Sequence, residues 1–174
     1  MTIRKSVILI CGLLLCSIGY ADTTAFGITL GKTTIDEFKR AYPNAMLKGT
    51  NQWIKGDMYL VSAGDLDFDG VIEKKIIFSH EGKASTIIID MNRDRFDDVQ
   101  DMLAKKYKAV YKEIPYVGDK YVRYANGDDR IELDSPHLSF SMQLMYTDKL
   151  MQDSFKKGNA EEIKQKKEKE TELL

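Results

Sequence analysis

Residues 94–107 read DRFDDVQDMLAKKY, and this stretch decides the predicted fold. Five apolar side chains recur in it at helical spacing: Phe96, Val99, Met102, Leu103 and Tyr107. Acidic residues crowd the first turn and lysines the last, which is the order that the helix dipole favours, and Asp94 is the predicted N-cap. The stretch therefore predicts an amphipathic helix that lies on a sheet.

A second helical pattern stands earlier in the chain, in TTIDEFKRAY at residues 33–42. Thr34 and Glu37 have the spacing of a capping box, which predicts the start of this helix. Pro43 disfavours helical geometry in the residue before it, so the helix is expected to end at Tyr42. Each of the two helices is followed by strand-like sequence.

The strand-like sequence alternates apolar and polar side chains and is broken by turn residues. The predicted strands are 58–62, 66–68, 75–79, 85–91, 109–114, 120–124, 130–134 and 138–146. Asn126-Gly127 is the clearest hairpin signal, and a two-residue turn there would pair Val122 with Ile131. These patterns predict an α+β fold with a helix packed on an antiparallel sheet.

The sequence also contains a faint internal repeat. Ile35 aligns with Phe96, and Phe38 aligns with Val99, with the same number of residues between the members of each pair. The segment GDMYLV (56–61) aligns with GDKYVR (118–123) at nearly the same separation along the chain. A helix-plus-strands unit written twice, over residues 26–92 and 94–147, would produce these matches. Chance similarity is the alternative, and the sequence leaves the choice open.

The domain organisation follows from composition. Arg4 and Lys5 precede an uncharged run that ends at Gly19-Tyr20-Ala21, which is the pattern of a cleaved signal peptide over residues 1–21. Residues 22–157 form one predicted domain, in which Met151 and Phe155 indicate a helical turn or two before Gly158-Asn159 interrupts the helix. The charged segment 158–174 is predicted as a solvated helix or frayed tail. We therefore expect an exported protein with no transmembrane span in the mature chain.

Composition excludes several classes of function. Both cysteines lie in the predicted signal peptide, which removes thiol catalysis, thiolate metal sites and disulfides from the mature domain. The formal net charge of the chain is −1, and no basic stripe is interleaved with aromatic residues, so nucleic acid is not an expected partner.

One motif suggests a metal ion. Asp65, Asp67 and Asp69 precede Gly70 in the order that opens a calcium-binding loop, and Glu73 stands at the ninth position. The twelfth position, where such loops carry a bidentate glutamate, holds Ile76. A simple hairpin with outward aspartates explains the same pattern, so Ca²⁺ binding is the alternative function and no cofactor is the main expectation.

Catalytic residues are sparse. His80 falls in a predicted hairpin loop, and Asp134, Ser135 and His137 are close in sequence without the convergent geometry that a triad needs. No phosphate-binding loop, nucleophile elbow or zinc-protease motif occurs. We expect a protein that is not an enzyme, with an unrecognised hydrolase as the third possibility.

The remaining candidate is a binding surface on the sheet. Strand alternation places five polar side chains on one outward face: Tyr121, Arg123, Arg130, Glu132 and Gln143. Tyrosine and arginine on a rigid element are the residue types enriched at interface anchors, so this face is the predicted partner-binding site. The alternative is an ordinary solvated sheet face with cross-strand charge pairs.

The segment FGITLGKTTIDEF at residues 26–38 resembles the opening of small bacterial envelope domains of the SmpA/OmlA (BamE-like) and β-lactamase-inhibitor-protein-like group. The resemblance implies a glycine-led turn, a helix on an antiparallel sheet, a Gram-negative periplasm and, in the inhibitor branch, a protein partner bound over a concave sheet face. The chain has Gly31-Lys32 where the group usually has Gly-Met, and it lacks a lipobox and a disulfide. No site residue is carried over from the group.

Overall fold

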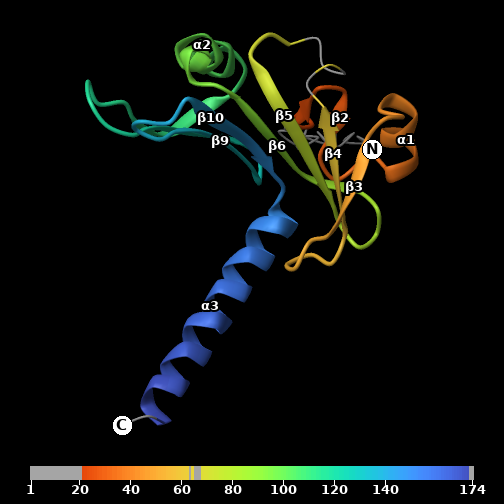
Figure 1. Cartoon of the computed structure of the whole chain (residues 1–174), viewed down its shortest axis with the longest axis vertical. Coiled ribbons are helices and arrows are strands. Elements are labelled where there is room, and N and C mark those ends of the chain that lie inside the picture. Colours follow the sequence, from red (N-terminus) through yellow and green to blue (C-terminus); the bar gives the residue numbers. More distant parts are fainter. Residues whose placement is uncertain (1–20, 63, 65–67, 173–174) are drawn as a thin grey trace, which may run out of the picture.

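An antiparallel sheet of eight strands organises the protein, in the order β3-β4-β5-β6-β10-β9-β8-β7 (Figure 1). The structure is a computed structural model that describes residues 21–62, 64 and 68–172, so the predicted signal peptide, apart from Ala21, lies outside the described residues. The strands are β3 (Met46–Thr50), β4 (Asp57–Ser62), β5 (Val71–Phe78), β6 (Ala84–Asn92), β7 (Lys108–Glu113), β8 (Lys120–Asn126), β9 (Asp129–Ser135) and β10 (Ser141–Thr147).

Three α-helices, one 3₁₀ helix and a small second sheet complete the described part of the fold. They are β1 (Thr24–Ala25), β2 (Ile28–Thr29), α1 (Ile35–Ala41), the short 3₁₀ helix η2 (Arg93–Arg95), α2 (Phe96–Lys106) and α3 (Lys149–Glu172). The predicted α+β class, with helices packed on an antiparallel sheet, is confirmed.

The sheet consists of two similar halves. In each half a helix, α1 or α2, precedes four consecutive antiparallel strands, and the last strands of the halves, β6 and β10, pair at the centre. The segments aligned in the sequence fall on β4 and β8, which are the second strands of their halves. Tyr59 is buried, however, whereas the aligned Tyr121 is half-exposed on the other face. The two halves therefore share the order of their elements, but aligned residues do not lie on the same face of the sheet.

Both α1 and α2 lie on the same face of the sheet, which we call the closed face. Phe38 of α1 packs its ring against the rings of Tyr59 and Phe78, with centroids 5.5 and 5.3 Å away. Val99 and Leu103 of α2 belong to the same core. Burial of these apolar side chains is the main force that fixes the helices to the sheet.

The two helix starts differ in how well sequence predicts them. Thr34 and Glu37 form the predicted capping box, and α1 ends with Tyr42 as its C-cap, as expected from Pro43. The N-cap of α2 is Arg95 rather than the predicted Asp94, because the 3₁₀ turn η2 leads directly into the helix. Met102 is 42% exposed, since it lies roughly 100° around the helix from the centre of the buried stripe.

Several predicted strand limits are corrected. The last strand begins at Ser141 and not at residue 138, because Leu138 adopts a left-handed backbone conformation with φ 65° that breaks the extended chain. Leu138 and Phe140 are consequently exposed instead of buried. Of the predicted strand 66–68, only Phe68 is described, and it lies in a bend. The edge strand β3 was not predicted, since most of its side chains are exposed and show no alternation.

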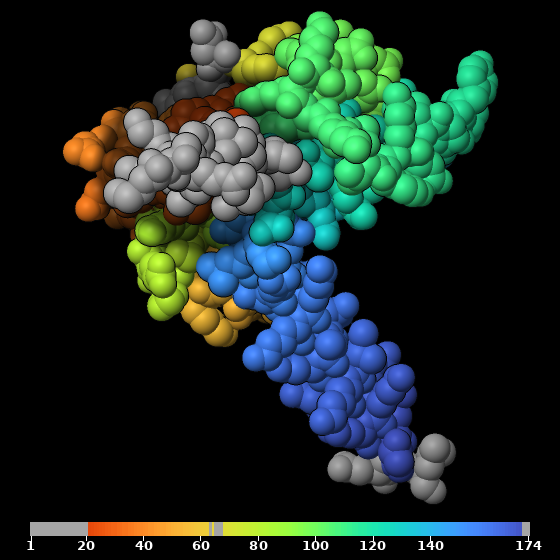
Figure 2. All heavy atoms as spheres, turned by 180° about the vertical axis from the view of Figure 1, so that it is seen from behind, coloured from red at the N-terminus to blue at the C-terminus, as the bar shows by residue number. Residues whose placement is uncertain are grey.

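The C-terminal helix is also corrected. α3 runs without interruption through Gly158 and Asn159 and extends far beyond the sheet (Figures 1 and 2). Gly158 allows close packing, because a Cβ at this position would lie 2.1 Å from Cζ3 of Trp53. The ring of Trp53 also meets that of Phe155 at a centroid distance of 5.4 Å. The glycine is therefore a packing position and not a helix breaker.

Candidate functional site

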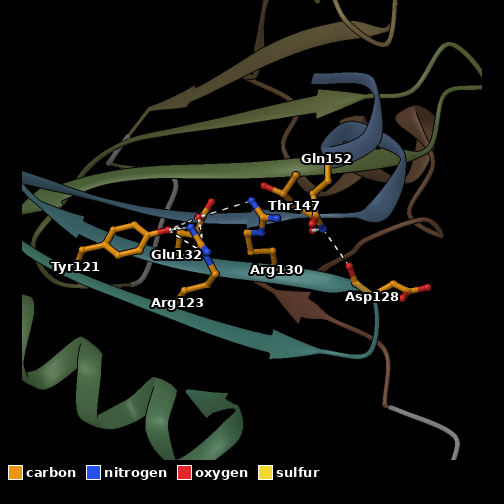
Figure 3. A network of polar contacts seen from close by, with 7 residues as sticks. All are labelled: Tyr121, Arg123, Asp128, Arg130, Glu132, Thr147 and Gln152. Carbon is orange, nitrogen blue, oxygen red and sulfur yellow. Dashed lines mark hydrogen bonds and ion pairs between the residues drawn. The ribbon is translucent and has the colours of Figure 1, made fainter. Parts of the chain in front are cut away.

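The face of the sheet opposite α1 and α2 is the site of interest, and we call it the open face. The first turns of α3 cover one end of it, where Met151 packs with Ile54 and Ile77 in a small second core. The part formed by β7, β8, β9 and β10 carries the predicted binding residues (Figure 3).

The hairpin of β8 and β9 sets which side chains reach the open face. Its two turn residues are Gly127 and Asp128, since Asn126 pairs with Asp129. The predicted pairing of Val122 with Ile131 is wrong by two residues, because the turn lies one residue later than expected and Val122 pairs with Leu133. A shift of two preserves the alternation of a strand, so the predicted assignment of faces is unaffected.

A polar network centred on Glu132 occupies the open face. The Tyr121 hydroxyl donates a hydrogen bond to Oε1 of Glu132, and Nε of Arg123 donates to the same oxygen at 3.1 Å. Nη1 of Arg130 lies 3.9 Å from this oxygen, and Nη2 of Arg123 donates to the Tyr121 hydroxyl at 2.8 Å (Figure 3). Four of the five predicted residues are thus brought into one network.

The network is held in place by burial and charge. The Glu132 side chain is only 13% exposed, so its charge needs the nearby cations and the hydroxyl as partners. Burial, together with the hydrogen bond to Glu132, raises the pKa of Tyr121 to about 12, although Arg123 acts in the opposite direction. At neutral pH Tyr121 is therefore a protonated donor, and the two arginine side chains remain partly exposed.

Gln143, the fifth predicted residue, lies apart from the network. It faces the same side, but its Nε2 donates to Oδ1 of Asp90 on β6 at 2.9 Å. Tyr111 of β7, which was not predicted, packs its ring against that of Tyr121 at a tilt of 55°, with centroids 5.9 Å apart. Asp90 meets Gln143 through the pairing of β6 with β10, which are far apart in the sequence, so no local pattern could assign it to this surface. Tyr111 pairs with Arg123 of the next strand, but a register shift between Ala109 and Tyr111 interrupts the alternation that would have placed it.

Two of the four residues in the calcium hypothesis can be placed. Both the backbone oxygen and Oδ2 of Asp69 accept from Nη1 of Arg95, at 2.6 and 3.1 Å. Glu73 lies 3.7 Å from the ammonium group of Lys75. Asp65 and Asp67 lie outside the described residues. The two placed carboxylates thus have cationic side-chain partners, and calcium binding stays a prediction.

The residues weighed for catalysis do not converge. Ser135 is fully buried on the closed face, whereas Asp134 is exposed on the open face. His80 lies in the β5–β6 turn and His137 in the β9–β10 loop, which are at opposite ends of the antiparallel sheet. Partial desolvation of its carboxyl group and the nearby carboxylates of Asp119 and Glu132 raise the pKa of Asp134, although the residue as a whole is exposed.

Neither the membrane-span criterion nor comparison with known proteins assigns the chain to a class. None of the helices in the described part of the chain is both long and apolar enough to cross a bilayer. The resemblance to BamE-like and inhibitor-like envelope domains stays a prediction. No protein-family model, curated protein or solved structure matches the chain.

Proposed function

We propose that the protein is a non-catalytic binding protein of the bacterial envelope that engages a protein or another envelope component through its open face. The observation that supports this proposal is the network of Tyr121, Arg123, Arg130 and Glu132 on a part of the sheet that α1 and α2 leave uncovered. The predicted signal peptide is the basis for the periplasmic location.

The network has the properties of a prepared binding surface. The Arg123 and Arg130 side chains are 39% and 31% exposed, so part of each can contact a partner while Glu132 holds it in place. Side chains that are already ordered lose less conformational entropy on binding than free ones. Arginine and tyrosine are also the residue types most often found at energetic centres of interfaces.

The open face is not required for the main core. Ile131 and Leu133 of β9 are fully buried on the closed face, whereas Arg130 and Glu132 alternate with them on the other side. A polar network on this face adds little to folding, because partly exposed ion pairs contribute about 0–1 kcal/mol. Its arrangement is better explained by recognition than by stability.

The proposal is tested by replacing Tyr121 and Arg130 with alanine and recovering partners from the envelope fraction of the native cells. A matched control replaces Met102 and Lys105, which are exposed on α2 on the opposite side of the sheet. We expect the open-face variant to lose a partner that both the unmodified protein and the control retain. The same set of partners for all three proteins would contradict the proposal.

A further inference from the structure

Two neighbouring loops at one end of the sheet expose large apolar side chains. The loop between β7 and β8 carries Tyr116 and Val117 and stands out from the sheet (Figure 1), and the loop between β9 and β10 carries Leu138 and Phe140. Asp119 links the two loops, because its Oδ1 accepts from the backbone N–H of His137 at 2.6 Å. We call the four apolar side chains the apolar loop end.

The exposure of these side chains is nearly complete. Tyr116 is fully exposed, and Phe140, Leu138 and Val117 are 96%, 83% and 68% exposed. Single exposed apolar residues are common on protein surfaces, but several together at a protruding end are typical of a contact site. None of the four contributes to the buried core of the domain.

The second loop is held rigidly in this exposed form. The carbonyl oxygen of Phe140 accepts from the backbone N–H of Arg93 at 3.1 Å, and the carbonyl of Ser139 accepts from Nη1 of Arg93 at 3.3 Å. Leu138 has φ 65°, a left-handed conformation that is strained for a side chain of this size. A strained backbone that presents a leucine to solvent points to a function outside folding.

The charges around the loop end indicate what it contacts. Asp94 and Asp97 line the groove between the β9–β10 loop and the start of α2, and Asp119 and Asp134 flank the two loops. Two basic residues, Arg93 and Lys120, line the same groove. Lys120 lies 3.5 Å from Asp97, and Nη1 of Arg93 donates to the carbonyl of Ser139, so both cations are already engaged within the chain. Loops that insert into bilayers generally combine apolar tips with unpaired basic residues that attract anionic lipids. The aspartates around the loop end instead complement a partner surface that is bordered by basic residues.

We infer that the apolar loop end inserts into an apolar cleft of a folded protein whose rim is rich in lysine or arginine. This surface is separate from the Glu132 network, and the inference rests on the proposed function for the existence of a protein partner. The projecting shape suits a concave receptor, and the rigid loops lower the entropy lost on insertion.

The first test identifies what touches the loops in the cell. A photoreactive phenylalanine analogue replaces Tyr116 or Phe140 in the full chain, with Met102 as the matched exposed position on α2. We expect the same single protein adduct from both loop positions and none from position 102. The cross-linked peptide should belong to an apolar cleft bordered by basic residues.

The second test uses that protein in purified form. Phe140→Ser should weaken its Kd at least tenfold, added salt should weaken binding further, and the melting midpoint of the variant should be unchanged. Vesicles of phosphatidylethanolamine and phosphatidylglycerol in a 3:1 ratio should not bind the chain. If the cross-linked protein has no apolar cleft, and Phe140→Ser does not weaken its Kd tenfold, the inference is contradicted.

The contradicting outcomes are distinct. Vesicle binding that Phe140→Ser abolishes would show a membrane-inserting end, and many unrelated adducts would show non-specific adhesion. An unchanged Kd for Phe140→Ser, with a Kd weakened by Arg130→Ala, would overturn this inference and leave the proposed function intact. Loss in neither variant would overturn both.

Discussion

Glu132 shows how one buried carboxylate can order a surface. Its Oε1 atom is approached by a tyrosine hydroxyl and an arginine Nε from β8 and by Arg130 from its own strand. Each partner alone would be a weak surface contact, but together they satisfy a charge that is mostly removed from water. The position of the two arginines therefore depends on this one residue.

The pKa of Tyr121 measures this arrangement directly. We expect it to titrate near 12. In Glu132→Gln its pKa should fall part of the way toward the ordinary tyrosine value, because that substitution removes the negative charge, whereas burial of the hydroxyl persists and the amide oxygen can still accept. The difference in tyrosinate absorbance between each protein and its Tyr121→Phe counterpart isolates this residue.

The raised pKa also has a consequence for stability. The folded state holds Tyr121 protonated more tightly than the unfolded state, so its contribution to stability is present below about pH 10 and is lost as the pH rises through about 12. Titration of Tyr121 at an ordinary pKa in the unmodified protein would contradict the network.

Gly158 makes a second prediction at the level of single residues. Alanine normally stabilises a helix interior relative to glycine by about 1 kcal/mol. Here its Cβ would collide with the Trp53 ring, so we expect Gly158→Ala to lower the free energy of unfolding by about 1–3 kcal/mol instead. Trp53 is the single tryptophan of the chain, so its fluorescence reports on the packing around this one ring. Unchanged emission with increased stability would show that α3 does not pack on this ring.

Helix α2 carries the clearest prediction for an element. Leu103 is 5% exposed and Met102 is 42% exposed, although they are adjacent in the sequence. Leu103→Ala should reduce the free energy of unfolding by about 2–5 kcal/mol, as for other buried leucines. Met102→Ala should change it by no more than about 0.5 kcal/mol. Urea unfolding of the two variants checks this, and equal effects would mean that the helix is rotated from its described position.

The elements that sequence predicts well are those fixed by local chemistry. The capping box at Thr34 and the apolar stripe of residues 96–107 depend on neighbours within a turn or two. Leu138 was misassigned because its left-handed backbone breaks a pattern that still alternates in the sequence. Gly158 was taken for a breaker because its packing partner, Trp53, lies about a hundred residues earlier.

At the scale of the whole molecule, long-range contacts limit what sequence can predict. The central pairing of β6 with β10 joins strands about fifty residues apart, and no turn signal specifies it. Lys74 is fully buried on the closed face, with its ammonium group 3.6 Å from the centroid of the Tyr42 ring. From the sequence alone, a lysine within an apolar strand would be placed on the solvent-exposed face, so the burial of Lys74 could not be predicted.

The assignment of faces was nevertheless predictable, because it depends on alternation and not on exact pairing. The register error of two residues between β8 and β9 left Tyr121, Arg123, Arg130 and Glu132 together on the open face. Strand parity is therefore the most reliable information that this sequence contains about its candidate site. The partner of each strand and the position of α3 required the structure.

The central claim is that the closed face of the sheet holds the main core, while the part of the open face that α3 leaves uncovered is available for binding. Two adjacent residues of β9 test it: Ile131 is fully buried on the closed face, and Arg130 lies on the open face. The free energy of unfolding in urea should fall by about 2–5 kcal/mol for Ile131→Ala. For Arg130→Ala it should change by less than about 1 kcal/mol. A larger loss for Arg130→Ala than for Ile131→Ala would contradict the account.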